Sequence, residues 1–146
     1  MGIFDWLKKG KAKPVKKHSS LLEDIATSKD WIAKALLSSG YNADFTLESL
    51  KEIDRFFDEQ INGLLAEGRG AKLFAVGSYI GEVLINQYGG QWITDDDDPT
   101  GEINIAVKFD DGSMVWPVQR AMKRFQEGEG NDIFPYVLAI GEEMKK

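Results

Sequence analysis

The sequence predicts an α+β fold in which helices come first and a small antiparallel sheet follows, and two patterns support this class. Between residues 20 and 88, apolar side chains recur every three or four positions, as they do along one face of a helix. Between residues 91 and 116, apolar and polar residues alternate, and turn-forming residues separate the runs. We therefore expect N-terminal helices and a central helix packed on a three-stranded antiparallel meander, followed by two short C-terminal helices.

Two amphipathic helices are predicted before the central one. Ser20 begins a capping box, and a helical pattern with a restart signal at Ser28 continues from it to Gly40. Thr46 is the expected N-cap of the next helix, which we expect to end at residues 68–70. The apolar stripe of this second helix consists of Leu47, Leu50, Ile53, Phe57, Ile61 and Leu64.

The run from Leu73 to Trp92 is the longest apolar-rich stretch of the chain, and we expect it to form the central helix up to Gly89. Gly77 and Gly81 lie inside this helix, and an interior glycine costs about 1 kcal/mol relative to alanine. We therefore expect another backbone to approach closely at these glycines. Glu82 is the one acidic residue of the run, and a covered carboxylate needs a partner unless it takes up a proton.

Three strands and two helices are expected after the central helix. Strand patterns cover residues 91–94, 103–109 and 114–116. Asp111-Gly112 is a tight-turn signal between the last two strands, and Pro117 suits the first position of a helix. The basic residues of that helix, Arg120, Lys123 and Arg124, are expected to face water. A last short helix is expected to begin near residues 131 and 132.

Composition argues against several classes of function. The chain contains no cysteine, which excludes disulfides, thiolate nucleophiles and iron–sulfur clusters. Its single histidine, His18, argues against a Ser-His-Asp triad and against a multi-histidine metal site. The net charge of −6 argues against nucleic-acid binding by the body of the protein. We therefore expect neither a cofactor nor a metal ion.

The charge is unevenly distributed along the chain. Residues 1–18 carry a net charge of +5, which leaves −11 for the remainder. We expect a basic, amphipathic and flexible tail at 1–18 and a single α+β domain at 19–146. Residues 1–17 combine an apolar tip with lysines, and two interpretations remain open. Either the apolar tip packs on the protein's own domain or a neighbour, or the tail makes weak contact with a membrane surface or a partner. The start of the chain lacks a signal-peptide core, so we expect a cytoplasmic protein.

Glu82 is the first candidate functional residue. A covered carboxylate can serve as a general acid or base, and Tyr79 would be its companion on the same helix. The structural alternative is an ion pair with Arg120 or Arg124, or a hydrogen bond from the Trp92 indole.

Two further groups of residues are candidates for binding. Trp92 and Trp116 lie on predicted strands and offer an aromatic floor for a ligand, although buried tryptophans more often belong to the core. The basic strip of Arg120, Lys123 and Arg124 pairs either with the protein's own acidic groups or with an anionic partner.

The four aspartates at 95–98 have part of the spacing of a calcium-binding loop. Pro99 stands where the third ligand of such a loop is needed, and Glu102 follows too closely to complete it. We therefore expect a solvated turn at this position and no metal site.

Scattered residues between about 45 and 130 resemble a family of small bacterial proteins catalogued as a domain of unknown function. The pattern consists of Ser49-Leu50 and Asp54, Gly77, Gly81-Glu82, Gly90, Trp92, Val107, Asp111, Pro117, Lys123-Arg124 and Glu127-Gly128. The resemblance implies a bacterial, intracellular, single-domain α+β protein and carries no activity with it. Its glycines, glutamate, tryptophan and Lys-Arg pair are more typical of a fold signature or a binding surface than of a hydrolytic site.

We expect a non-enzymatic module that binds an unidentified protein or small molecule and no nucleic acid. Its candidate binding residues are Tyr79, Glu82, Trp92, Trp116, Arg120 and Arg124. Two alternatives remain: a cofactor-independent enzyme that uses Glu82 as acid or base, and a membrane-peripheral protein tethered by residues 1–17. Phe56 beside Phe57 adds a homodimer as a further alternative.

Overall fold

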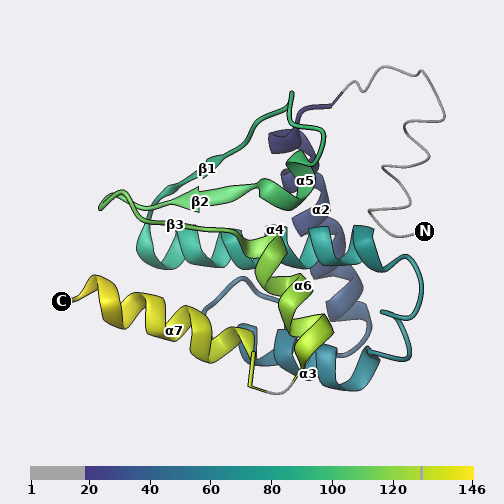
Figure 1. Ribbon diagram of the computed structural model, residues 1–146. Coiled ribbons are helices and arrows are strands. Elements are labelled where there is room, and N and C mark those ends of the chain that lie inside the picture. The colour runs from purple at the N-terminus through teal and green to yellow at the C-terminus, as the bar shows by residue number, and fades with distance from the viewer. Residues whose placement is uncertain (1–18, 129) are drawn as a thin grey trace.

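A computed structural model describes residues 19–128 and 130–146, and within them the chain forms six helices and one three-stranded antiparallel sheet (Figure 1). The predicted α+β class is confirmed. In chain order the elements are α2 (Leu21–Ser38), α3 (Leu50–Gln60), α4 (Arg69–Tyr88), β1 (Gln91–Ile93), α5 (Gly101–Asn104), β2 (Ala106–Lys108), β3 (Met114–Val115), α6 (Pro117–Glu127) and α7 (Ile133–Met144). The tail predicted at 1–18 lies outside the described residues.

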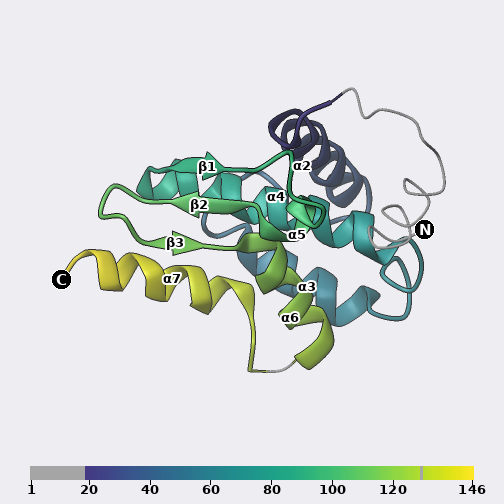
Figure 2. The same cartoon turned by 45° about the horizontal axis from the view of Figure 1, so that its top comes forward.

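α4 lies at the centre of the fold. The sheet covers one side of it and α3 and α7 lie on the other, while α2 and α6 cross it (Figures 1 and 2). Because α4 is covered from several sides, most of its residues from Leu73 to Leu84 are buried, and Val76, Tyr79 and Ile80 are fully so. None of the helices within the described ranges is long and apolar enough to cross a membrane.

The two interior glycines of α4 lie where neighbours approach it closely. A Cβ atom at Gly77 would lie 2.6 Å from the Cα atom of Val118 and 2.8 Å from its backbone nitrogen, so the first turn of α6 leaves no room for a side chain. The predicted backbone approach is confirmed at this position. At Gly81 the neighbour is instead the indole ring of Trp92 on β1, which a Cβ atom would overlap.

The sheet has the predicted meander order β1-β2-β3, but its middle strand is shorter than expected. Residues 101–104 form the helical turn α5, which leaves three residues for β2. The side chain of Asp98 explains this difference, because it accepts hydrogen bonds from the Thr100 amide and from the Asn104 side chain across the turn. These hydrogen bonds, above all the one from Asn104, hold the pKa of Asp98 below its ordinary value.

The boundaries of the first helices differ from the prediction in two places. α2 continues through Ser28 without interruption, and its predicted capping box at Ser20 is present. α3 begins at Leu50 and ends at Gln60, whose side chain accepts a hydrogen bond from the Leu64 amide in the following turn. The glycines at 68 and 70 therefore lie at the start of α4 rather than at the end of α3.

α3, α6 and α7 meet at a buried ion pair between Asp54 and Arg124. Arg124 Nε lies 3.3 Å from Asp54 Oδ1 and 3.1 Å from Asp132 Oδ1, and its Nη2 atom lies 2.7 Å from Asp58 Oδ1. The carboxylate of Asp54 also accepts the amide hydrogens of Ile133 and Phe134, at 2.7 and 2.9 Å, and thus caps the N-terminus of α7. The prediction that Arg124 faces water is therefore wrong, because α3 and α7 surround it with three carboxylates.

The ionisation of this pair follows from its burial and its hydrogen bonds. Burial raises the pKa of Asp54, while the two amide hydrogens of α7 and the guanidinium of Arg124 oppose that rise. Burial lowers the pKa of Arg124, but its hydrogen bonds to Asp58 and Asp54 outweigh this and raise it. Phe56 and Phe57 are also buried in this region, so the aromatic surface that suggested a homodimer belongs to the core.

We expect Asp54→Ala to destabilise the fold far more than Asp58→Ala, although both residues contact Arg124. Removing Asp54 leaves a buried guanidinium without its buried partner, which costs about 3–5 kcal/mol. The Asp58 side chain is 70% exposed, and its removal leaves Arg124 paired with Asp54 and Asp132, so we expect a smaller loss of about 1–2 kcal/mol. Urea denaturation of both variants measures the two free energies of unfolding. Equal losses would contradict a structural role for the Asp54–Arg124 pair.

We expect Gly77→Ala to lower the free energy of unfolding by about 1–3 kcal/mol through overpacking against Val118. Helix propensity alone predicts the opposite sign, since alanine is about 1 kcal/mol better than glycine inside a helix. Ala71→Gly at an exposed position of α4 is the matched control and should cost about 1 kcal/mol. A stabilised Gly77→Ala variant would show that α6 does not pack on α4 at this distance.

Candidate functional site

α6 carries two arginines one turn apart, and they have different surroundings. Pro117 occupies the first turn of this helix, and Arg120 and Arg124 follow at a spacing that places both on the same side. Arg124 is directed at the carboxylates of α3 and α7. Arg120 instead lies over the ring of Tyr136 on α7, with 4.1 Å between its guanidinium carbon and the ring centre.

Arg120 has no carboxylate partner among the described residues, and its Nε atom is fully buried without a hydrogen-bond acceptor. A buried donor left without an acceptor costs about 1–3 kcal/mol, so such groups are uncommon in folded proteins. The charge of Arg120 also acts on its neighbour, because burial raises the pKa of Tyr136 and the arginine opposes that rise. Arg120 is therefore a partly covered cation with unused hydrogen-bonding capacity.

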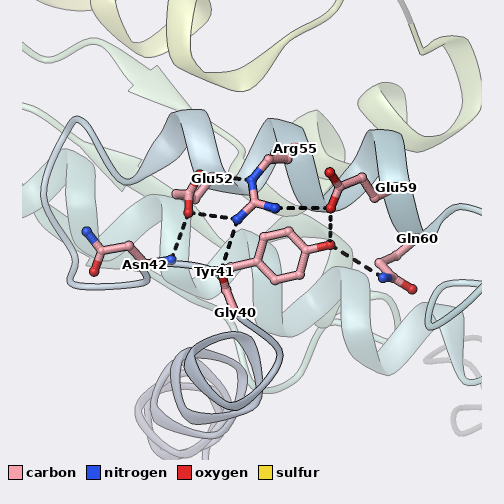
Figure 3. Close-up of polar contacts among 7 residues, drawn as sticks. All are labelled: Gly40, Tyr41, Asn42, Glu52, Arg55, Glu59 and Gln60. Atoms are coloured by element: carbon pink, nitrogen blue, oxygen red, sulfur yellow. Dashed lines mark hydrogen bonds and ion pairs between the residues drawn. The ribbon is translucent and has the colours of Figure 1, made fainter.

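Arg55 shows how the same kind of stack is completed elsewhere in the molecule (Figure 3). Its guanidinium carbon lies 4.3 Å from the centre of the Tyr41 ring. In addition its nitrogens donate hydrogen bonds to Glu52, Glu59 and the carbonyl of Gly40. These hydrogen bonds, above all the one with Glu52, raise the pKa of Arg55. The stack of Arg120 on Tyr136 lacks the carboxylates that surround Arg55.

A groove of about 420 Å³ begins at Tyr136 and separates the β2–β3 hairpin from α7. In Figure 2 the hairpin and α7 run side by side, and residues of both line the groove. The residues that line the groove are Phe109, Asp111, Ser113, Val115, Tyr136, Ala139, Ile140, Glu143 and Met144. Most of this surface is apolar, and the volume lies in the range of pockets that bind small ligands.

The two ends of the groove have opposite charge. Tyr136 and the neighbouring Arg120 lie at the end near the start of α7, while Glu143 and Asp111 lie at the end near the hairpin turn. The Ser113 side chain and amide donate hydrogen bonds to Asp111, and these hold the pKa of that carboxyl below its ordinary value. Asp111 is therefore negatively charged at neutral pH, which makes one end of the groove acidic and the other basic.

The predicted binding residue Tyr79 is part of the core. Its hydroxyl accepts a hydrogen bond from the Phe45 amide at 2.9 Å and shares a second one of 2.6 Å with Ser49 Oγ. Phe45 stacks on the Tyr79 ring and has a positive φ of 63°, a strained conformation for a residue with a side chain. Burial raises the pKa of Tyr79, so its hydroxyl remains protonated and fixes the loop before α3.

Glu82 lies half-buried on α4 and does not line the groove beside α7. Neither of the ion pairs predicted with Arg120 or Arg124 is present, because Arg124 is occupied by other carboxylates and Arg120 lies on Tyr136. The carboxylate of Glu82 makes no hydrogen bond or ion pair within the described part of the chain, and the alternative of a hydrogen bond from the Trp92 indole is not observed.

Trp92 and Trp116 lie on opposite faces of the sheet. Trp92 pairs with Val107, which pairs with Val115, so these three side chains share the face that packs on α4. Trp116 follows Val115 in extended conformation and therefore projects to the other face, where its side chain is 42% exposed. The two tryptophans do not form one aromatic floor.

The structure brings together residues that sequence reasoning did not connect. Asp54 belongs to the sequence pattern of the resemblance, but nothing local marks it as the partner of Arg124. Tyr136 was not a candidate at all, because its contact with Arg120 depends on how α7 packs against α6. The one available signal was a basic strip in an acidic chain, and it pointed to Arg120, Lys123 and Arg124 together.

The aspartates at 95–98 do not gather around a common point. Asp96 accepts the Leu21 amide at the start of α2, Asp95 accepts the Asp97 amide, and Asp98 holds the turn before α5. Among the described residues no group of three or more acidic or histidine side chains is placed to hold a metal ion. The loop thus stabilises its own turns and caps a helix.

Several residues that carried the resemblance make contacts between elements of the fold. Ser49 binds Tyr79, and Asp54 binds Arg124. Gly81 receives the ring of Trp92, and Gly77 receives the backbone next to Pro117. These pairs join α3, α4, α6 and β1, so the pattern describes contacts between elements.

Comparison with known proteins identifies the family of this chain. A family model described as a domain of unknown function (DUF3806) matches residues 51–136. No curated protein and no solved structure matches the chain. The matched span contains the Asp54–Arg124 pair and the stack of Arg120 on Tyr136. Because this span covers more than half of the chain, the protein belongs to the DUF3806 family, a domain of unknown function.

Proposed function

We propose that this domain is a binding module that holds an anionic group of its ligand at Arg120. The observation that carries the proposal is the incomplete coordination of this arginine. Its Nε atom is buried without an acceptor, whereas Arg55 and Arg124 in the same molecule are each surrounded by carboxylates. The terminal Nη atoms of the same guanidinium are not fully buried and make no hydrogen bond among the described residues, so an anionic ligand would supply acceptors to them.

The chemistry of the guanidinium specifies the kind of group that fits. Its planar fork of N–H donors matches the two oxygens of a carboxylate or phosphate. The stack on Tyr136 holds the plane of the guanidinium in one orientation, which lowers the entropy lost when a ligand binds. Partial burial also strengthens the attraction, because a charge pair away from bulk water is screened less.

A purely structural role is the alternative, in which Arg120 covers the ring of Tyr136 and does nothing more. A guanidinium over an aromatic ring contributes about 0.5–2 kcal/mol by itself. This role accounts for the position of the arginine over the ring but not for its unused donors. It also predicts that no anion binds at this position.

We expect Arg120→Gln to weaken the binding of a simple carboxylate by about 10–100-fold, which corresponds to the loss of a charged hydrogen bond. The probes are acetate, benzoate and inorganic phosphate, titrated into isotope-labelled protein while the NMR signal of the Arg120 side-chain Nε–H group is followed. A saturable shift of that signal gives the affinity directly.

Lys123→Gln is the matched control for this experiment, because it removes a positive charge from an exposed position of the same helix. It should retain the affinity of the wild type. Equal affinities in Arg120→Gln and Lys123→Gln, or a wild type in which none of the three anions produces a saturable shift, would refute the proposed function.

A further inference from the structure

The groove that begins at Tyr136 has a shape and a charge distribution that specify a ligand. We propose that it binds an extended peptide by its C-terminal end, with the terminal carboxylate on Arg120 and the chain lying between β3 and α7. This inference rests on the proposed anion site and adds the class of partner.

The edge of β3 supplies the first argument. β3 is the last strand of the order β1-β2-β3 and therefore has a strand neighbour on one side only. The Phe109 amide donates to the Ser113 carbonyl, so the carbonyl of Ser113 points toward the strand opposite. Bonding directions alternate along an antiparallel pair, which turns the amide and carbonyl of Met114 away from β2. These groups can pair with an added chain, as edge strands do.

The length of the groove supplies the second argument. Tyr136 and Glu143 are seven residues apart on α7, which corresponds to about 10 Å along the helix axis. An extended chain advances about 3.3 Å per residue, so the groove accommodates about three residues. A short peptide end therefore fits between the two charged ends.

The lining of the groove determines which side chains suit it. Phe109, Val115 and Ile140 provide an apolar floor. In an extended peptide alternate side chains point to the same side, so the last and third-last residues would face this floor. Both are therefore expected to be apolar.

The charges at the two ends of the groove determine the direction of the chain. The peptide's terminal carboxylate would lie at the basic end of the groove, near Arg120. A lysine or arginine of the peptide would lie at the acidic end, near Asp111 and Glu143, so that peptide and groove carry opposite charges at each end. The partner is thus the C-terminus of a protein whose last four residues are, in order, a basic residue, an apolar residue, any residue and an apolar residue.

The test uses acetylated tetrapeptides with lysine first, serine third, and Val, Ile, Leu or Phe at the second and last positions. One pool has a free C-terminal carboxylate, and the second pool, identical in sequence, has a C-terminal amide. We expect the free-acid pool to bind the wild type about tenfold or more tightly than the amide pool. In Arg120→Gln the two pools should bind equally weakly, and Arg120→Lys should give an intermediate difference because it keeps the charge without the planar fork.

A second pair of variants tests whether the peptide lies in the groove. Ala139 is an exposed residue of α7 that lines the groove, and Ala26 is an exposed residue of α2 that does not. Ala139→Trp should fill the groove and weaken the binding of the free-acid pool about tenfold or more, while the binding of benzoate persists. Ala26→Trp should bind the pool as the wild type does.

The outcomes separate this inference from the proposed function. If benzoate binds at Arg120 but the two peptide pools bind alike, the peptide inference is overturned and the anion site stands. If Ala139→Trp and Ala26→Trp bind the free-acid pool alike, the groove is not the docking site and the inference is overturned. If an amidated pool with an internal glutamate binds as tightly as the free-acid pool, recognition of a chain end is overturned. If no anion binds, both proposals fall.

Discussion

The buried carboxylate of Asp54 determines where α7 begins, and the remaining features of the candidate site depend on that position. It accepts the amide hydrogens of the first two residues of α7 and pairs with Arg124 of α6. One side chain of α3 thereby orients two later helices with respect to each other. A carboxylate in this position is costly to bury, and its three donors offset that cost only while all of them stay in place. The groove between α7 and β3 therefore has one wall whose starting position is fixed by Asp54.

The same interaction accounts for the different surroundings of the two arginines of α6. The anchoring of Arg124 fixes the rotation of α6 about its axis, and Gly77 fixes how closely α6 approaches α4. With both constraints in place, the side chain one turn before Arg124 is directed at α7, where it meets a tyrosine ring and no carboxylate. The unused donors of Arg120 are thus a consequence of packing that is required elsewhere. This is why the conservative variants at Arg120 separate binding from folding better than variants at Arg124 would.

The parts of the fold that could be predicted from sequence are those with local causes. The capping box at Ser20, the proline at the start of α6 and the Asp111-Gly112 turn are each decided by a few neighbouring residues. The missed features depend on distant partners. A helical pattern places Arg124 on the polar side of α6, but it cannot show that α3 and α7 bring three carboxylates to that side. Likewise, the alternating pattern that predicted a long middle strand was overridden by Asp98, whose side chain stabilises a helical turn.

The same distinction applies to the candidate site. Arg120 could be selected from sequence because an acidic chain with a basic strip suggests a use for that strip, whereas Tyr136 and the groove arise only when α7 packs beside β3. The family match ends at residue 136, so it includes both members of the stack and excludes the α7 residues from Ala139 to Met144 that form one wall of the groove. Under our proposals, the element that holds the carboxylate therefore lies within the matched domain, and much of the surface that selects apolar side chains lies beyond it. Anion binding and sequence preference should then be separable, since substitutions in the second half of α7 change which peptide is preferred without removing the site for its terminal charge.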